Sequence, residues 1–259
     1  MDILSKIKHA AKSAAIAFSM YSKIVMPQFE WKQEDMKYAL CFFPFVGAVI
    51  AILTWLWWSF CNYFSIGSLC FSFIGISIPL FVTGGIHMDG YIDTIDALHS
   101  YANRERKLEI LKDAHIGAFA LIMTILYVLV CAGAYSQIVK STAMASVCVS
   151  YCISRILSAF AVVSFPCAKK EGTLYMFADA AHERTVKASL YIQLVLCAAC
   201  QIIINYKTGI IQLCASALMF AYYYYKSKRE FAGITGDLAG WFVTLSEGIS
   251  IVAAAITCL

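Results

Sequence analysis

The sequence is poor in charge. Charged residues make up 14% of its 259 residues and hydrophobic residues 61%, whereas an ordinary soluble domain is roughly 25% charged. With a mean hydropathy of +0.73, these figures exclude a disordered chain, a collagen-like chain and a secreted disulfide scaffold. The formal net charge of +4 is small and divided among several segments, which argues against nucleic-acid binding. The composition is that of a polytopic membrane protein.

Long stretches without charge predict the membrane-spanning helices. Residues 38–84 contain no Asp, Glu, Lys, Arg or His. A bilayer core about 30 Å thick needs about 20 helical residues, so this block is long enough for two spans joined near residues 62–67. Further stretches of span length are 117–139, 188–206 and 208–225, together with 141–165, broken only by Arg155, and 238–259, broken only by Glu247. We predict an all-α polytopic membrane helical bundle of about seven transmembrane helices, forming one domain over residues 1–259. Residues 6–26 alternate Lys with apolar residues and predict an N-terminal interfacial helix.

The basic residues predict the orientation in the membrane. They gather in the N-terminal segment and in the loops after the second, fourth and sixth spans, and only Lys140, Lys207 and Arg155 lie elsewhere. Because basic loops stay in the cytoplasm, the N-terminus and the charged loops are expected there. The acidic residues follow the same distribution, with Glu247 as the exception. Chemistry that involves charge is therefore expected at the cytoplasmic face.

Three aspartates follow the second span at helical spacing. Asp89, Asp93 and Asp96 stand at i, i+4 and i+7, so at about 100° per residue they share one helix face. Carboxylates gathered in this way suit a hard divalent ion, above all Mg²⁺, which leaves coordination positions for water and phosphate. The pattern indicates metal-assisted phosphoryl transfer at the membrane surface. The alternative is a solvated acidic face with helix caps. Asp113, just before the third span, is a further candidate ligand from a second helix.

Basic and imidazole side chains accompany the aspartates. Arg106 and Lys112 lie between the acidic segment and the third span, where they can bind phosphate or simply obey the positive-inside bias. His87 precedes Asp89 by two residues, which would direct it away from the acidic face of a helix. It is therefore a weaker ligand candidate, and a candidate acid, base or substrate contact.

Two further polar features involve the last span, the second of them together with the fourth. Thr235, Gly236 and Asp237 enter it within a glycine-containing segment, and exposed N–H groups at a helix start favour phosphate. Asp237 is either another ligand or the N-cap of that span. Arg155 and Glu247 lie at similar depths inside spans, where a lone charge is costly. We predict that both face the bundle interior and pair with each other, either as a functional site or as a structural ion pair.

These motifs together resemble the cobalamin synthase family, adenosylcobinamide-GDP ribazoletransferase. The matching segments, in the family's order, are Phe43-Pro44-x-Val46-Gly47, the run from Gly84 to Asp96, Arg104 to Gly117, Ser154-Arg155, and Gly233 to Gly240 with Glu247. The chain departs from the family's usual residues at Ala97, Ala232 and the pair Ala114-His115, which leaves substrate contacts at position 115 in doubt. None of the aspartates is lost.

The resemblance implies an Mg²⁺-dependent transferase in a bacterial or archaeal cell membrane. Adenosylcobinamide-GDP and α-ribazole, or α-ribazole 5′-phosphate, would give adenosylcobalamin, or its 5′-phosphate, and GMP. Asp89, Asp93, Asp96 and Asp113 would hold Mg²⁺ on the pyrophosphate. His87 or a carboxylate, Asp93 or Asp96, would take the proton of the attacking hydroxyl. The residues expected at the substrates are Arg106, Lys112, Arg155, Thr235, Gly236, Asp237 and Glu247. The lipid bilayer is the expected surrounding, and a homo-oligomer is left open.

Two other functions compete with this one. A CDP-alcohol phosphotransferase also clusters aspartates in a membrane helix, but its pattern requires Asp-Gly-x-x-Ala-Arg, and no Ala-Arg follows Asp89-Gly90. A cation-coupled transporter would use Arg155 and Glu247 as a path for protons or substrate, although the chain shows no paired half-sequences. Release of GMP would distinguish an enzyme from a transporter.

Overall fold

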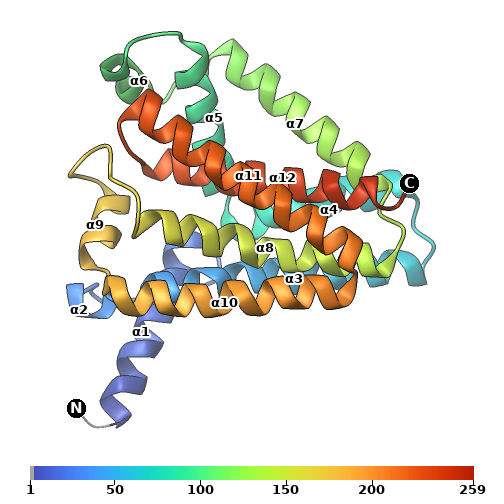
Figure 1. Ribbon diagram of the computed structural model, residues 1–259, viewed down its shortest axis with the longest axis horizontal. Coiled ribbons are helices and arrows are strands. Elements are labelled where there is room, and N and C mark those ends of the chain that lie inside the picture. The colour runs from blue at the N-terminus through green and yellow to red at the C-terminus, as the bar shows by residue number, and fades with distance from the viewer. Residues whose placement is uncertain (1–2) are drawn as a thin grey trace.

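The computed structural model describes residues 3–259, and its regular elements are α-helices. In chain order they are α1 (Ile3–Tyr21), α2 (Gln33–Met36), α3 (Ala39–Tyr63), α4 (Ser68–Thr83), α5 (Ile86–His99), α6 (Arg104–Ile110), α7 (Ala118–Ser136), α8 (Ser141–Val162), α9 (Thr173–Ala180), α10 (Glu183–Ile204), α11 (Tyr206–Phe231) and α12 (Gly236–Ile256). The predicted all-α class is thus confirmed. Long helices lie side by side in the bundle, and the short helices α2, α6 and α9 lie at one end (Figure 1).

Membrane-spanning character is carried by five helices, α3, α7, α8, α10 and α12. A sixth span results if α4 and α5 count as one bent span. The predicted polytopic bundle is confirmed, and its count of about seven is close to this result. The difference is α11, for which the sequence predicted a span over residues 208–225 and which is not among these candidates.

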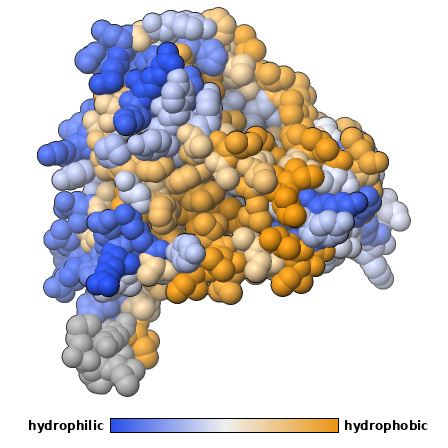
Figure 2. All heavy atoms as spheres, in the orientation of Figure 1, coloured by the Kyte–Doolittle hydropathy of each residue, from blue (hydrophilic) through white to orange (hydrophobic). Residues whose placement is uncertain are grey.

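The core lies around α8 and α12. In their most apolar stretches 72% of α8 and 78% of α12 are buried, against 22% of α7 and 11% of α10. α8 packs on α3, α10 and α12, while α5 packs on α12 and α7. The outward faces of α7 and α10 are apolar side chains with no protein to cover them, as expected of surfaces that meet lipid. Figure 2 shows this apolar surface, with polar residues gathered at the end that holds α2, α6 and α9.

The chain turns sharply at the entrance to the acidic segment. α4 and α5 meet at 97°, across Gly84 and Gly85, which have φ angles of 64° and 82°. Side chains other than glycine rarely adopt this left-handed region, so two consecutive glycines make the bend accessible. The bend lets α5 leave the direction of α4 and lie against α12. This bend was not predicted from the sequence, because residues 38–84 were assigned to two spans and the aspartates to a separate segment.

The N-terminal helix is clamped by a buried carboxylate. Asp35 in α2 accepts a hydrogen bond from Lys12 at 2.9 Å, lies 3.0 Å from Nδ1 of His9, and its carbonyl oxygen accepts from Ser13. Burial alone would raise the pKa of Asp35, but the hydrogen bonds from Lys12 and His9 outweigh burial and hold that pKa below its usual range. α1 also packs on α3. The predicted N-terminal helix is therefore present; its place at the interface stays a prediction.

Candidate active site

The three aspartates of α5 lie on the side of that helix that is not fully buried. Asp89 is exposed, and Asp93 and Asp96 are half-buried. Asp93 lies close enough to Asp89, Asp237 and Asp96 to be repelled by all three. Asp237 begins the adjacent helix α12. The helical spacing in the sequence thus predicted a true cluster, and the fold adds a carboxylate from a second helix.

Two glycines bring α5 and α12 together at this cluster. A Cβ at Gly90 would lie 2.6 Å from the carbonyl oxygen of Asp237, and one at Gly240 would lie 3.1 Å from the carbonyl oxygen of His87. Backbone-to-backbone contact this close requires residues without side chains. The contact places the first turn of α12 beside the first turn of α5.

Asp237 is not the N-cap of α12. The side-chain oxygen of Thr235 accepts from the backbone N–H of Leu238 and caps the helix. The N-cap interpretation of Asp237 is therefore wrong. Its half-buried carboxylate is left to face the site, where it also lies near Lys169.

Asp96 and Asp113 lie apart from this contact. A Cβ at Gly117 would collide with Oδ1 of Asp96, so the Asp96 carboxylate points at the start of α7. Asp113 is in an exposed loop, where the backbone N–H and ring of His115 hydrogen-bond it at 3.0 and 2.7 Å. These bonds hold the pKa of Asp113 below its usual range. The fold therefore directs Asp113 toward His115 rather than toward Asp89 and Asp237.

A cavity opens where α5 and α12 meet. This acidic cavity has a volume of about 230 Å³. Its polar lining includes His87, Asp89 and Asp237, and the aromatic residues Tyr21 and Phe43 line it as well. The two rings lie 6.4 and 5.7 Å from that of His87. Neither residue was predicted to line the site: Phe43 was singled out only as part of a matching family segment, and Tyr21 was one apolar position among many.

A polar groove continues from the acidic cavity. This groove has a volume of about 450 Å³, and it shares Thr173, Leu174, Gly236 and Asp237 with the acidic cavity. We name it the basic groove after Lys112 and Lys169, although its two carboxylates, Glu171 and Asp237, balance their charge. Lys112 pairs with Glu171 at 3.1 Å, and Lys169 donates to the carbonyl oxygen of Leu108 at 3.1 Å. Lys112, Thr235, Gly236 and Asp237 thus meet as predicted candidates. Lys169 was counted in the sequence only as evidence of orientation.

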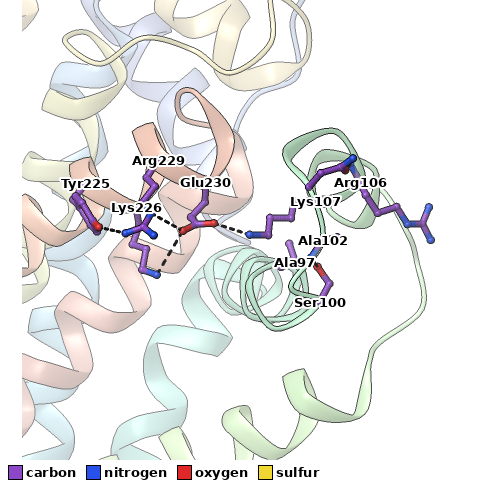
Figure 3. Close-up of polar contacts among 10 residues, drawn as sticks. Ala97, Ser100, Ala102, Arg106, Lys107, Tyr225, Lys226, Arg229 and Glu230 are labelled. Carbon is purple, nitrogen blue, oxygen red and sulfur yellow. Dashed lines mark hydrogen bonds and ion pairs between the residues drawn. The ribbon is translucent and has the colours of Figure 1, made fainter.

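Arg106 lies outside both spaces. Its guanidinium pairs with Glu109 at 2.8 Å on the exposed side of α6. The next residue, Lys107, is buried and pairs with Glu230 of α11 at 2.6 Å. Figure 3 shows Lys107 reaching toward Glu230 while Arg106 points away. Lys107 therefore joins α6 to α11, whereas Arg106 lines neither the acidic cavity nor the basic groove and stays a predicted substrate contact.

The two intramembrane charges form an ion pair. Nη1 of Arg155 on α8 donates to Glu247 on α12 at 2.5 Å and to the carbonyl oxygen of Tyr151 at 2.9 Å. Both side chains are buried, which confirms the predicted pairing inside the bundle. The pair lines an interior cavity of about 160 Å³. His87 lines this interior cavity as well as the acidic cavity, so it lies between the two.

No preformed metal cage is present among residues 3–259. In that part of the chain no three His, Cys, Asp or Glu side chains are arranged to hold a metal ion. Mg²⁺ does not require such a cage, because it is usually bound by one or two carboxylates together with waters and substrate phosphates. The oxygen-only set of Asp89, Asp93 and Asp237 fits that manner of binding.

The fold and site define a membrane-embedded helical protein with an acidic cavity and a basic groove at its polar end. A comparison of sequences then shows the family: the Cobalamin-5-phosphate synthase family matches residues 13–255, and the chain belongs to it. No solved structure matches the chain.

Relatives of similar length carry one common name, adenosylcobinamide-GDP ribazoletransferase. The relative from Lachnoclostridium phytofermentans is 40% identical over 242 residues, which cover 92% of each chain. One from Clostridium botulinum is 29% identical over 252 residues, covering 96% of this chain and 99% of the relative. One from Clostridium perfringens is 28% identical over 239 residues, covering 91% and 94%.

Proposed function

We propose that this protein is a magnesium-dependent adenosylcobinamide-GDP ribazoletransferase. It joins adenosylcobinamide-GDP to α-ribazole, or to α-ribazole 5′-phosphate, and releases GMP. The observation that carries the proposal is the meeting of Asp89 and Asp93 with Asp237 beside a basic groove, in a chain that matches the family over residues 13–255. The family match also favours this function over the phospholipid enzyme and the transporter.

The reaction is a phosphoryl transfer. The 5′-hydroxyl oxygen of ribazole attacks the phosphorus that carries the cobinamide, and a new O–P bond forms. The bond from that phosphorus to the bridging oxygen breaks, and GMP leaves with the bridging oxygen and its electron pair. The hydroxyl proton passes to a base on the protein. Atoms and charge balance without any further reactant.

The protein's task is to hold the diphosphate and to accept the proton. Asp89 and Asp93, with Asp237 from the facing helix, would hold Mg²⁺, which when bound neutralises phosphate charge and stabilises the leaving group. Lys112 and Lys169 supply positive charge in the groove for the guanylate side. His87 borders the acidic cavity, and its buried Nε2 has no hydrogen-bond partner within residues 3–259. We assign His87 Nε2 as the proton acceptor, with Asp93 as the alternative.

The remaining predicted residues take secondary places in this proposal. Asp96 reinforces the negative potential from the next turn of α5, and Asp113 and Arg106 lie beside the site rather than in it. The membrane orientation that suits the proposal places the N-terminus and the acidic cavity on the cytoplasmic side, where nucleotide substrates are made.

The test is GMP release by the purified protein in detergent, given adenosylcobinamide-GDP and α-ribazole with either Mg²⁺ or EDTA. We expect magnesium-dependent GMP and corrinoid product, with a loss of at least about 100-fold in Asp93→Asn, since one metal-holding or charge-stabilising group contributes about that much. Asp179→Asn is the matched control, because Asp179 is an exposed carboxylate on α9. Product without GMP, or no product from folded protein, would contradict the proposal.

A further inference from the structure

The interior cavity beside the Arg155–Glu247 pair has no role in the chemistry described above. It lies between α4, α7, α8 and α12, and its volume is about 160 Å³. Most of its wall is apolar, with Leu80, Val128 and Ile251 as examples. An apolar core cavity of about 150 Å³ accepts a benzene molecule. The α4 side of the cavity is half-buried rather than closed, which leaves room for a somewhat larger ring system.

The polar edge of this cavity has unused hydrogen-bonding groups. Arg155 uses Nη1 for Glu247, but its Nε and Nη2 have no partner among the described residues. The hydroxyl of Tyr151 and Nε2 of His87 also lack one. A buried polar group without a partner is costly, so such groups cluster where something else supplies the partner. Here the missing partner is an acceptor, since guanidinium and phenol groups both donate.

The charge of the edge limits the ligand further. Arg155 is already balanced by Glu247 at 2.5 Å, so a charged ligand would upset a neutral pair in a low-dielectric core. The ligand that fits is therefore uncharged, flat and largely apolar, with an acceptor atom on one edge. A fused heteroaromatic ring with a pyridine-type nitrogen has these properties.

The position of the cavity connects it to the reaction. His87 lines both the interior cavity and the acidic cavity, where it is joined by Asp89. A ring held in the interior cavity would therefore have its attached sugar at His87 and the sugar's 5′-hydroxyl directed toward Asp89. In ribazole the base is a benzimidazole, which carries one free ring nitrogen and an apolar edge.

We propose that the interior cavity is the acceptor subsite, in which the heteroaromatic base of ribazole lies against Val128 and Ile251 with its free nitrogen toward Arg155. This inference rests on the proposed function. It gives the two members of the ion pair different roles: Arg155 donates to the base, and Glu247 positions Arg155 and balances its charge. The phosphate groups stay in the acidic cavity. It also gives a physical reason for part of the site to lie inside the bundle, because the base is the least polar part of the two substrates.

The experiment fills the cavity from two walls. Val128→Phe on α7 and Ile251→Phe on α12 reduce the volume of the cavity. Each has a control on the same helix whose side chain points outward. The control on α7 is Leu129→Phe, at a side chain that is 58% exposed, and the control on α12 is Ile249→Phe, at a side chain that is 39% exposed. We expect each cavity variant to raise KM for α-ribazole about 10- to 100-fold, as for a blocked apolar pocket. KM for adenosylcobinamide-GDP should stay within about twofold, and the controls should resemble the wild type.

Direct binding separates this inference from the proposed function. Isothermal titration of the wild type with α-ribazole alone, without donor or Mg²⁺, should show saturable binding that Val128→Phe weakens and Leu129→Phe keeps. Binding with that pattern supports the subsite even if turnover fails. An active wild type whose cavity variants keep the KM for α-ribazole overturns the subsite and leaves the function standing. A selective rise in KM for adenosylcobinamide-GDP would also overturn it, because the cavity would then hold part of the donor.

Discussion

Gly90 of α5 faces Asp237 of α12 so closely that a Cβ on the glycine would lie 2.6 Å from the Asp237 carbonyl oxygen. This contact joins the aspartates of one helix to the carboxylate of the other. Without it, the acidic residues would lie on one helix face and would enclose nothing. The close approach of the α5 and α12 backbones thus brings the aspartates of both helices into one site.

Gly90→Ala should therefore separate the two helices. A methyl group at this position forces the backbones apart, and such overpacking costs about 1–3 kcal/mol of stability. We expect GMP release to fall at least about 100-fold, because displacement by about 1 Å at reacting groups has this effect. Steady-state assays with thermal unfolding in detergent check both effects. The control is Gly133→Ala on α7, where an added Cβ meets nothing within 4 Å. Equal losses in the two variants would contradict the role of the contact.

The Arg155–Glu247 pair should depend on both partners for stability. Arg155→Met leaves Glu247 buried without its partner, and breaking a buried pair in this way costs about 3–5 kcal/mol. We expect the double variant Arg155→Met, Glu247→Met to unfold at a higher temperature than the single variant, because no buried charge is left over. Fluorescence-detected thermal unfolding measures the difference. The exposed pair of Lys187 and Glu183 is the comparison, and Lys187→Met should change the unfolding free energy by less than about 1 kcal/mol. A double variant no more stable than the single one would argue against the pairing.

The clamp on α1 should weaken in acid. Because the folded-state pKa of Asp35 lies below its usual range, its ionised form stabilises the docked helix above the ordinary carboxyl pKa, and that contribution is lost as pH falls through the folded pKa. The protection of the α1 amides against hydrogen exchange, relative to an unfolded chain at the same pH, should therefore fall below about pH 4, near the ordinary aspartate pKa. Asp35→Asn should show fast exchange already at neutral pH and no such acid step. Glu34→Gln, at an exposed neighbouring carboxylate, should behave as the wild type, and an unchanged profile in Asp35→Asn would refute the clamp.

Hydrophobic stretches and the distribution of charge predicted the membrane-spanning helices and the buried ion pair. Span length follows from bilayer thickness, so the apolar stretches predicted α3, α7, α8, α10 and α12 to within a few residues. The cost of a lone buried charge predicted that Arg155 would meet Glu247.

Tertiary contacts decided the rest. The 97° bend at Gly84 and Gly85 does not follow from any hydrophobic periodicity in the sequence. Asp113 was expected near Asp89, but its loop turns it to His115 instead. Lys169 looked like one more cytoplasmic lysine until the fold placed it beside Asp237. The cavities lie between helices that are distant in the sequence, so the pattern of residues along one helix does not predict them.

Lys169 and Lys170 offer the sharpest comparison in the basic groove. They are adjacent in the chain, but Lys169 is half-buried and lines the groove beside Asp237, while Lys170 is exposed. A charged hydrogen bond to phosphate contributes about 1.5–3 kcal/mol. Lys169→Ala should therefore raise KM for adenosylcobinamide-GDP by at least about tenfold, with KM for α-ribazole unchanged.

Lys170→Ala has the same change of net charge, so it controls for general attraction of an anionic substrate to a basic surface. Such attraction is screened at about 0.15 M salt, whereas a partly buried contact is screened much less. Measured at that ionic strength, Lys170→Ala should therefore leave both KM values near those of the wild type. Equal effects of the two substitutions would mean that the groove attracts the donor through its overall charge, and that Lys169 makes no contact with phosphate.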